Sequence, residues 1–302
     1  MKILVAIPAY NEETGIGSVV LRSKKYADKV IVVDDGSTDK TAETAELAGA
    51  EVIRHHKNGG YGSSIKSCFE YARKHSPSVL VILDGDGQHN PDCMPKLVNP
   101  ILSGEADIVI GSRFLETKSE IPAYRKAGMK VLDTLTNIGT GKAKNVSDSQ
   151  SGYRTYSPKA YNNLNLSETG MGTGSEILIQ ADEQKLKIKE VPIKVRYDTG
   201  KSSEHPVTHG IHVVMAIIRV ISQRRPLFFF GVSGTVMLLG GLAVGWHVLD
   251  VFNRSNALAV GNALIAVTLT ITGMFTMLTG VILYSLEDSM QRVVGKNNRD
   301  RL

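Results

Sequence analysis

Short, continuous runs of apolar residues alternate with helix-like segments across residues 1–209. Such runs occupy residues 3–7, 30–33 and 79–83, and each is rich in Val, Ile or Leu. Continuous runs of this kind, separated by helices, are typical of a parallel sheet that is covered on both faces. In such sheets, ligands bind beyond the carboxyl ends of the strands. The pattern therefore predicts an α/β domain and directs attention to the loops that follow these runs.

Each of the three runs is followed by a loop that carries acidic side chains. These loops are residues 8–12 (Pro-Ala-Tyr-Asn-Glu), 34–39 (Asp-Asp-Gly-Ser-Thr-Asp) and 84–88 (Asp-Gly-Asp-Gly-Gln). Because the carboxyl ends of parallel strands lie at one edge of a sheet, we expect the three loops to converge on a single crevice.

Asp84 and Asp86 carry the clearest chemistry, because two carboxylates lie two residues apart at the end of a buried strand. Mg²⁺ and Mn²⁺ prefer oxygen ligands and often share them with substrate phosphates. A cation held here would bind a diphosphate and stabilise it as it leaves. The alternative is a plain strand-to-loop turn, since Asp-Gly is a common turn dipeptide. The two neighbouring acidic loops favour the metal site.

Four motifs together resemble the inverting family 2 glycosyltransferases with the GT-A fold: P-A-Y-N-E at 8–12, V-V-D-D-G-S-T-D at 32–39, D-G-D-G-Q-H at 84–89 and G-S-R-F at 111–114. The resemblance covers roughly residues 1–205 and is closest to the polyprenyl-phosphate (dolichyl-phosphate) sugar synthases. It implies a Rossmann-like, mostly parallel sheet and an Mg²⁺ or Mn²⁺ cofactor. The nucleotide sugar would be held by Pro8, Tyr10, Glu12, Val33, Asp35, Asp84, Gly85 and Asp86. The metal ligands would be Asp84, Asp86 and Gln88.

Basic side chains are expected at the lipid phosphate and the diphosphate: Arg113, Arg125, Arg196 and Lys201. Arg113 follows a strand and suits a bidentate phosphate contact, and the alternative for it is a surface ion pair. Mannosyl-transferring relatives usually have a Ser-Lys pair after this basic stretch, whereas Ser202 is followed here by Ser203. The segment resembles an archaeal-type subgroup whose donors are often UDP-sugars, which favours UDP-GlcNAc or UDP-glucose over GDP-mannose.

Asp148 and Glu176 complete the residues expected to take part in catalysis, beside Asp86 and Arg113. Residues 147–154 resemble the D-x-x-S-G-F-R stretch of the family, with Tyr for Phe. A phosphomonoester acceptor is mostly ionised near neutral pH, since its second pKa is about 6. We therefore expect Asp148 to orient Arg154 or the acceptor pocket rather than to remove a proton. Glu176 either lines the sugar pocket or caps the helix that it begins.

The composition changes abruptly at Pro226. Residues 227–249 and 257–286 contain no formal charge, and each is long enough to cross a hydrocarbon core of about 30 Å. The alternative, two buried helices of a soluble domain, is disfavoured by the length of both stretches. Residues 250–256 form the predicted turn of a transmembrane hairpin. Basic residues flank both ends of the hairpin: Arg219, Arg224, Arg225, Arg292, Lys296, Arg299 and Arg301.

These basic flanks predict that both termini and the catalytic domain are cytoplasmic, in an integral protein of the plasma membrane. Apolar and basic residues interleave over residues 210–226, which predicts an amphipathic juxtamembrane helix. Residues 287–302 form a basic cytoplasmic tail. A further basic and apolar stretch, residues 121–138, is either an ordinary surface helix or a platform that receives the lipid phosphate.

The expected enzyme transfers a sugar from a nucleotide-diphosphate sugar to dolichyl or polyprenyl phosphate with inversion, giving a lipid-monophosphosugar for glycan assembly. Its expected partners are the donor, the lipid acceptor and membrane lipids, and a homo-oligomer is left open. The net charge of +5 comes without a basic stripe interleaved with aromatics, which argues against nucleic acid.

Two alternative enzymes are a GDP-mannose-dependent dolichyl-phosphate mannosyltransferase and a hydroxyl-directed membrane glycosyltransferase. The latter usually has a Q-x-x-R-W motif, whereas the single Trp here, Trp246, lies in an apolar stretch. A non-enzymatic scaffold is disfavoured by the intact Asp35, Asp84 and Asp86.

Overall fold

The chain divides into two compact units, Met1–Val220 and Ile221–Leu302. The computed structural model describes residues 2–115, 146–195, 214–215, 218–219, 221–222, 225–256 and 259–299, with side chains as far as residue 286. The predicted domain boundary at residue 209 and most of the predicted juxtamembrane helix lie outside these described residues.

The first unit is built on a seven-stranded sheet with the strand order β3-β2-β1-β4-β6-β5-β7. Neighbouring strands are parallel except at β6, which runs antiparallel to both β4 and β5. The predicted mostly parallel sheet is therefore confirmed. The strands are β1 (Ile3–Ala9), β2 (Lys29–Asp34), β3 (Glu51–Arg54), β4 (Val79–Ile82), β5 (Ile108–Ser112), β6 (Arg154–Tyr156) and β7 (Ile188–Pro192).

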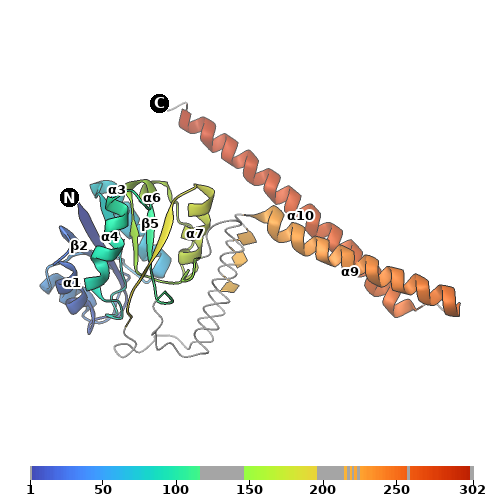
Figure 1. Ribbon diagram of the computed structural model, residues 1–302, viewed down its shortest axis with the longest axis horizontal. Helices are drawn as coiled ribbons and strands as arrows, with labels where there is room; N and C mark the ends of the chain where they lie inside the picture. Colours follow the sequence, from blue (N-terminus) through green and yellow to red (C-terminus); the bar gives the residue numbers. More distant parts are fainter. Residues whose placement is uncertain are drawn as a thin grey trace. The chain divides into compact units, whose positions relative to one another are not determined.

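Helices cover both faces of this sheet, as Figure 1 shows. Strand β1 explains the arrangement, because successive side chains of a strand point to opposite faces. Leu4 and Ala6 belong to the core shared with α3, α6 and α7, whereas Val5 and Ile7 belong to the core shared with α1, α2 and α4. The helices of this unit are α1 (Ile16–Ser23), α2 (Thr41–Leu47), α3 (Tyr61–His75), η1 (Pro91–Cys93), α4 (Met94–Leu102), α6 (Pro158–Asn163) and α7 (Thr173–Glu183).

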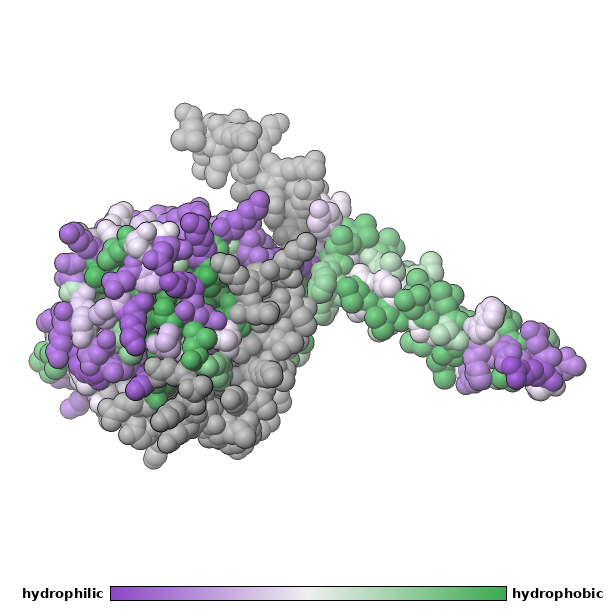
Figure 2. All heavy atoms as spheres, viewed as in Figure 1, coloured by the Kyte–Doolittle hydropathy of each residue, from purple (hydrophilic) through white to green (hydrophobic). Residues whose placement is uncertain are grey.

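The second unit consists of two long helices, α9 (Pro226–Ser255) and α10 (Val260–Arg299), which lie side by side. Glycines permit the close approach: a Cβ added to Gly234 would lie 2.7 Å from the carbonyl oxygen of Gly273. Such small residues are common where membrane helices pack together. Figure 2 shows apolar side chains along the pair and polar side chains gathered at one end of it.

Both helices are candidate membrane spans by length and composition, over Pro226–Ser255 and Val260–Leu286. Only 11% and 17% of their most apolar windows are buried, unlike the core helices of a soluble domain. The predicted turn at residues 250–256 is wrong in its position, because α9 continues to Ser255. An i,i+4 ion pair between Arg254 and Asp250 (3.1 Å) supports this last turn, and Asn256 ends the helix with a left-handed φ of 49°.

Candidate functional site

The loops that follow β1, β2 and β4 leave the sheet at one edge. The parallel register pairs Ala9 with Asp34 across β1 and β2. The backbone N–H of Asp35 donates to the carbonyl of Ala9 at 2.9 Å, which joins the first two loops. A Cβ added to Gly15 would lie 2.9 Å from the carbonyl oxygen of Gly85, so the chain after β1 also contacts the loop after β4. The three acidic loops therefore meet, as the sequence predicts.

Asp84 has an unusual environment within this meeting point. Its Oδ2 lies 3.4 Å from Nε2 of His89, whereas its Oδ1 is buried and has no hydrogen-bond partner among the described residues. Burial alone raises the pKa of Asp84, but His89, the nearby Tyr61 hydroxyl and Arg113 hold it below the ordinary value. A buried, ionised oxygen without a partner is costly, so this atom fits a cation.

Asp86 and Glu12 add negative charge to the same place. Burial and the neighbouring Asp84 raise the pKa of Asp86, and its Oδ1 accepts the backbone N–H of Gln88 at 2.9 Å. Burial, Asp86 and Asp84 raise the pKa of Glu12 to about 7. The carboxylates repel one another, and a divalent cation would relieve that repulsion.

The donor set suits Mg²⁺ or Mn²⁺, which prefer carboxylate, amide and phosphate oxygens. Within the described ranges, no cluster of three or more His, Cys, Asp or Glu side chains forms a ready-made metal cage. A cation at Asp84 and Asp86 would therefore complete its shell with water and substrate oxygens. Mg²⁺ commonly binds in this way, through one or two carboxylates.

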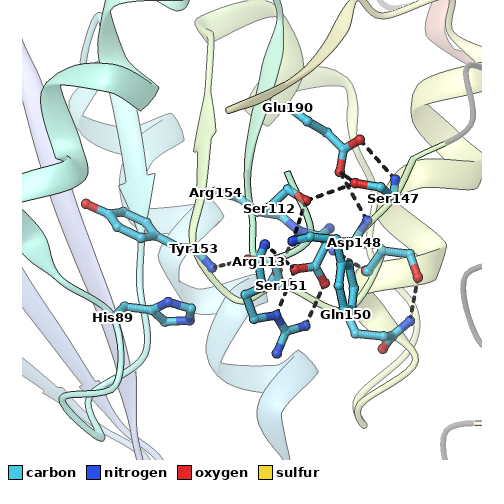
Figure 3. Close-up of polar contacts among 12 residues, drawn as sticks. His89, Ser112, Arg113, Ser147, Asp148, Gln150, Ser151, Tyr153, Arg154 and Glu190 are labelled. Atoms are coloured by element: carbon cyan, nitrogen blue, oxygen red, sulfur yellow. Dashed lines mark hydrogen bonds and ion pairs between the residues drawn. The ribbon is translucent and has the colours of Figure 1, made fainter. Parts of the chain in front are cut away.

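Arg113 and Asp148 form a buried, bidentate ion pair (Figure 3). The Nε of Arg113 donates to Oδ2 of Asp148 at 2.7 Å, and its Nη2 donates to Oδ1 at 2.6 Å. The two side chains are only 13% and 1% exposed, so the alternative of a surface ion pair is wrong. The predicted contact between Asp148 and Arg154 is also wrong. Arg154 donates instead to the carbonyl oxygens of Ser151 (2.9 Å), Gly174 (3.0 Å) and Ser149 (2.5 Å).

Glu190, on β7, supports this ion pair and was not predicted from the sequence. Its carboxylate accepts the backbone N–H and hydroxyl of Ser147 at 2.9 and 3.0 Å and the backbone N–H of Asp148 at 3.1 Å. Ser147 also contacts Ser112, with their hydroxyl oxygens 2.9 Å apart. The chain around Ser112 and Arg113 is thereby joined to the chain around Ser147 and Asp148. No motif marks Glu190, because its partners lie more than 40 residues away.

Glu176 holds a loop of its own chain. The side chain is fully buried, and it accepts the backbone N–H (3.0 Å) and hydroxyl (2.6 Å) of Ser167 and the backbone N–H of Glu168 (2.9 Å). Helix α7 begins at Thr173, so Glu176 is not the cap of this helix. The predicted catalytic or pocket-lining role is not supported by a carboxylate that is buried and bonded in this way.

The side chains expected to bind the nucleoside differ in their exposure to solvent, and so in whether a ligand can contact them. Tyr10 is 43% exposed, whereas Pro8 and Val33 are buried and Val33 belongs to the core under α3. The Val33 side chain is therefore closed to a ligand. Asp35 is 3% exposed and binds the backbone N–H groups of Gly59 and Gly60.

Comparison with known proteins identifies the family of this domain. The family model described as glycosyl transferase family 2 matches residues 4–164, which is more than half of the chain. The chain belongs to glycosyl transferase family 2. A UDP-N-acetylglucosamine–dolichyl-phosphate N-acetylglucosaminyltransferase of Methanococcus voltae is 34% identical to this family 2 chain over 236 residues, covering 70% of the chain and 91% of that protein.

Two further comparisons bear on this family 2 domain. A polyprenol monophosphomannose synthase of Mycolicibacterium smegmatis is 31% identical over 205 residues, covering 64% of this chain and 76% of that protein. The fold matches glucosyl-3-phosphoglycerate synthase from Mycobacterium tuberculosis, solved with Mn²⁺, UDP and phosphoglyceric acid. That match has a TM-score of 0.58 and 23% identity, and it covers 73% of this chain and 78% of that one. The predicted GT-A fold is therefore confirmed.

Three of the predicted phosphate-binding residues of this family 2 enzyme, Arg125, Arg196 and Lys201, lie outside the described residues. The same holds for the predicted platform at residues 121–138. Of the predicted basic set, Arg113 is the member whose surroundings the structure describes. Its charge is close enough to Asp84 to lower the pKa of that carboxyl, which puts it near the acidic meeting point.

Proposed function

We propose that this family 2 glycosyltransferase transfers a sugar from a nucleotide-diphosphate sugar to dolichyl or polyprenyl phosphate, with inversion at the anomeric carbon. UDP-GlcNAc and UDP-glucose are the favoured donors, and the product is a lipid-monophosphosugar for glycan assembly. The observation that carries the proposal is the pair Asp84 and Asp86 at the carboxyl edge of the sheet, with Oδ1 of Asp84 buried and unpartnered. The family relatives named above support the lipid phosphate as the acceptor.

In the proposed reaction, an oxygen of the acceptor phosphate forms a bond to the anomeric carbon. The bond from that carbon to the donor diphosphate breaks, and its electron pair leaves with the nucleoside diphosphate. Asp84 and Asp86, with Gln88, would hold Mg²⁺ or Mn²⁺, which supplies positive charge for the diphosphate when it is bound. No side chain needs to remove a proton, because the acceptor phosphate is already ionised.

The chain's own residues would then bind and orient the substrates. Asp148 fixes the direction of the Arg113 guanidinium through two hydrogen bonds, and Arg113 carries positive charge toward Asp84. We assign Arg113 to the diphosphate, and Arg125, Arg196 and Lys201 to neutralising the lipid phosphate. Tyr10, next in the chain to the Ala9 whose carbonyl binds Asp35, offers an exposed ring for the nucleoside.

The two apolar helices would hold the enzyme in the membrane that contains its acceptor. Basic flanks at both ends of the hairpin support a cytoplasmic catalytic domain and cytoplasmic termini, at the plasma membrane. A homo-oligomer is compatible with this arrangement.

The decisive experiment offers radiolabelled UDP-GlcNAc, UDP-glucose and GDP-mannose, each with dolichyl phosphate, to the purified full chain. The lipid product is then extracted and hydrolysed to identify the sugar. Dolichol, which has a hydroxyl in place of the phosphate, is the matched acceptor control. The proposal is supported if labelled lipid forms with dolichyl phosphate as the acceptor and does not form with dolichol. Transfer to dolichol would indicate a hydroxyl-directed enzyme, and transfer from GDP-mannose alone would indicate a mannosyltransferase.

A further inference from the structure

His55 connects two side chains that the sequence places far apart. Its Nδ1 lies 2.6 Å from Oδ1 of Asp35, at the end of β2, and its Nε2 lies 2.9 Å from the hydroxyl of Ser67, on α3. The His55 and Asp35 side chains are 18% and 4% exposed. Because an ionised carboxylate can only accept, the hydrogen between His55 and Asp35 belongs to the imidazole. The His55 ring is therefore fixed at both nitrogens, by Asp35 at Nδ1 and by Ser67 at Nε2, and this second contact braces the ring.

The Asp35 carboxylate has room for about one more donor. Besides His55, it accepts the backbone N–H of Gly59, shared between Oδ1 (3.0 Å) and Oδ2 (3.1 Å), and the backbone N–H of Gly60 at 2.8 Å. A carboxylate offers about four acceptor positions, and three N–H groups use most of them. The Asp35 side chain is 4% exposed, so only a small part of the carboxylate can be reached by a ligand.

The position of Asp35 in the fold favours a nucleobase as the source of that further donor. Nucleotides bind open α/β sheets where the strand order reverses, and here the chain turns from the β1-β2-β3 side to β4 beside β1. Asp35 is bonded to the loop after β1, through its N–H to Ala9, and that loop carries the exposed ring of Tyr10. A base lying on this ring would present its edge to nearby polar groups.

We propose that His55 is a positioning residue: braced by Ser67, it orients Asp35 to accept one N–H from the nucleobase of the donor, and this favours uracil over guanine. Uracil presents a single imino N–H between two carbonyl groups. Guanine presents an imino and an amino N–H side by side and needs two free acceptor positions, which Asp35 lacks while His55 and the glycine amides occupy it. The proposal rests on the proposed function, since it concerns the donor of the same reaction.

The test uses isothermal titration of the purified full chain with UDP and with GDP, at saturating Mn²⁺. In His55→Leu, both hydrogen bonds of the ring are lost. In His55→Asn, the amide retains a donor at the position of Nδ1 but does not reach Ser67. Ser67→Ala removes only the brace. His56→Leu is the matched control, because it makes the same substitution at the neighbouring, exposed histidine.

We expect His55→Leu to weaken UDP binding about tenfold or more, as for the loss of one hydrogen bond to a charged group. His55→Asn should stay within about threefold of the wild type, Ser67→Ala should weaken UDP binding about two- to threefold, and His56→Leu should bind UDP normally. GDP should bind the wild type more weakly than UDP and should respond less to His55→Leu. Affinity for Mn²⁺ alone should not change in any variant, because His55 does not contact the acids of the metal site. If His55→Leu does not fold, Ser67→Ala must still weaken UDP binding measurably.

Two results would overturn the inference while leaving the glycosyltransferase proposal intact. One is equal UDP affinity in His55→Leu and His56→Leu. If His55→Leu also melts at a lower temperature in that case, His55 only supports the fold. The other is a wild type that binds GDP at least as tightly as UDP. A wild type that binds neither nucleotide would overturn the proposed function itself and this inference with it.

Discussion

Replacing Asp148 by Asn separates a positioning role from a catalytic one. The substitution retains the volume of the side chain but removes the charge that faces Arg113. It also places an amide N–H₂ against one of the two guanidinium donors that Asp148 now accepts at 2.6 and 2.7 Å. The Arg113 guanidinium would then lose the carboxylate that binds it in two places, in a site where this side chain is only 13% exposed.

The size of the effect follows from this burial. Removing one partner of a buried ion pair costs about 3–5 kcal/mol, because the remaining charge stays desolvated. Arg113 retains some contact with water, so we expect the lower end, about 3 kcal/mol. For a domain of 150–250 residues, each kcal/mol lowers the melting temperature by about 2–4 °C, which predicts a decrease of about 6–12 °C. Turnover should remain measurable, because an ionised acceptor phosphate needs no general base.

The assay combines thermal unfolding of the purified chain with transfer kinetics on dolichyl phosphate. Glu105→Gln is the matched control: it neutralises a carboxylate paired with Lys189 at 2.7 Å, but both side chains are about half exposed. Such surface pairs contribute about 0–1 kcal/mol, so the control should melt within about 4 °C of the wild type. If Asp148→Asn melts like the wild type and has lost all turnover, the positioning argument is wrong and Asp148 acts as a general base.

Three further predictions address the metal, the pH dependence and the topology. Asp86→Ala, or EDTA with the unchanged chain, should abolish transfer while the domain keeps its circular dichroism; full activity in EDTA would contradict the metal site. Glu12→Gln should stabilise the metal-free chain more at pH 8 than at pH 5, and the difference should be at most about 3 kcal/mol. The pKa of Glu12 is raised to about 7 in the folded chain, so folding favours the protonated carboxyl. The stability that this carboxyl contributes is therefore lost as the pH rises through that value. If Glu12→Gln changes the melting temperature equally at both pH values, the prediction is wrong. Added Mg²⁺ should reduce the difference between the two changes. In a background without the native cysteines, a cysteine at Asn256 should react with an impermeant thiol reagent on intact cells and one at Asn297 should not; the reverse result would mean the opposite orientation.

The sheet could be predicted from the sequence because its signal is local. A strand such as β1 is a continuous apolar run, and both of its faces are buried under helices, so the run itself reveals the parallel sheet. The acidic loops were equally visible, since each follows its strand directly. The two apolar helices are long enough to stand out by composition alone.

Helix ends were predicted less well, because backbone groups rather than side chains fix them here. Helix α1 begins at Ile16, after a turn in which the carbonyl of Glu12 accepts the N–H groups of Gly15 (3.1 Å) and Ile16 (3.0 Å). Gly15 provides no capping side chain, so no residue type marks this boundary. Helix α9 runs past its predicted end for a different reason, because the side chains of Asp250 and Arg254 pair with each other and are compatible with a helix.

The partners of the site residues could not be predicted, because they come from distant parts of the chain. Asp148 pairs with Arg113 across 35 residues, and Glu190 reaches Asp148 from a separation of 42. The motifs mark Arg113 and Asp148 but not their pairing, and Glu190 lies in no motif. Only the sheet order, which places β7 beside β5, brings them together.

The carboxylates singled out by the motifs therefore fall into two groups that the sequence could not distinguish. Asp148 and Glu176 are buried and bonded to donors of their own chain, and Asp35 is bonded in the same way with room for about one more donor. Asp84 is different, because its Oδ1 is the buried carboxylate oxygen without a partner in the part of the chain that the structure describes. A saturated carboxylate stabilises the fold at little net cost, whereas an unsatisfied one is stable only if something else supplies the positive charge. The same motif-bearing edge thus contains acids that shape the site and one acid that still requires a ligand, which is why the metal is assigned to Asp84 and its neighbour Asp86.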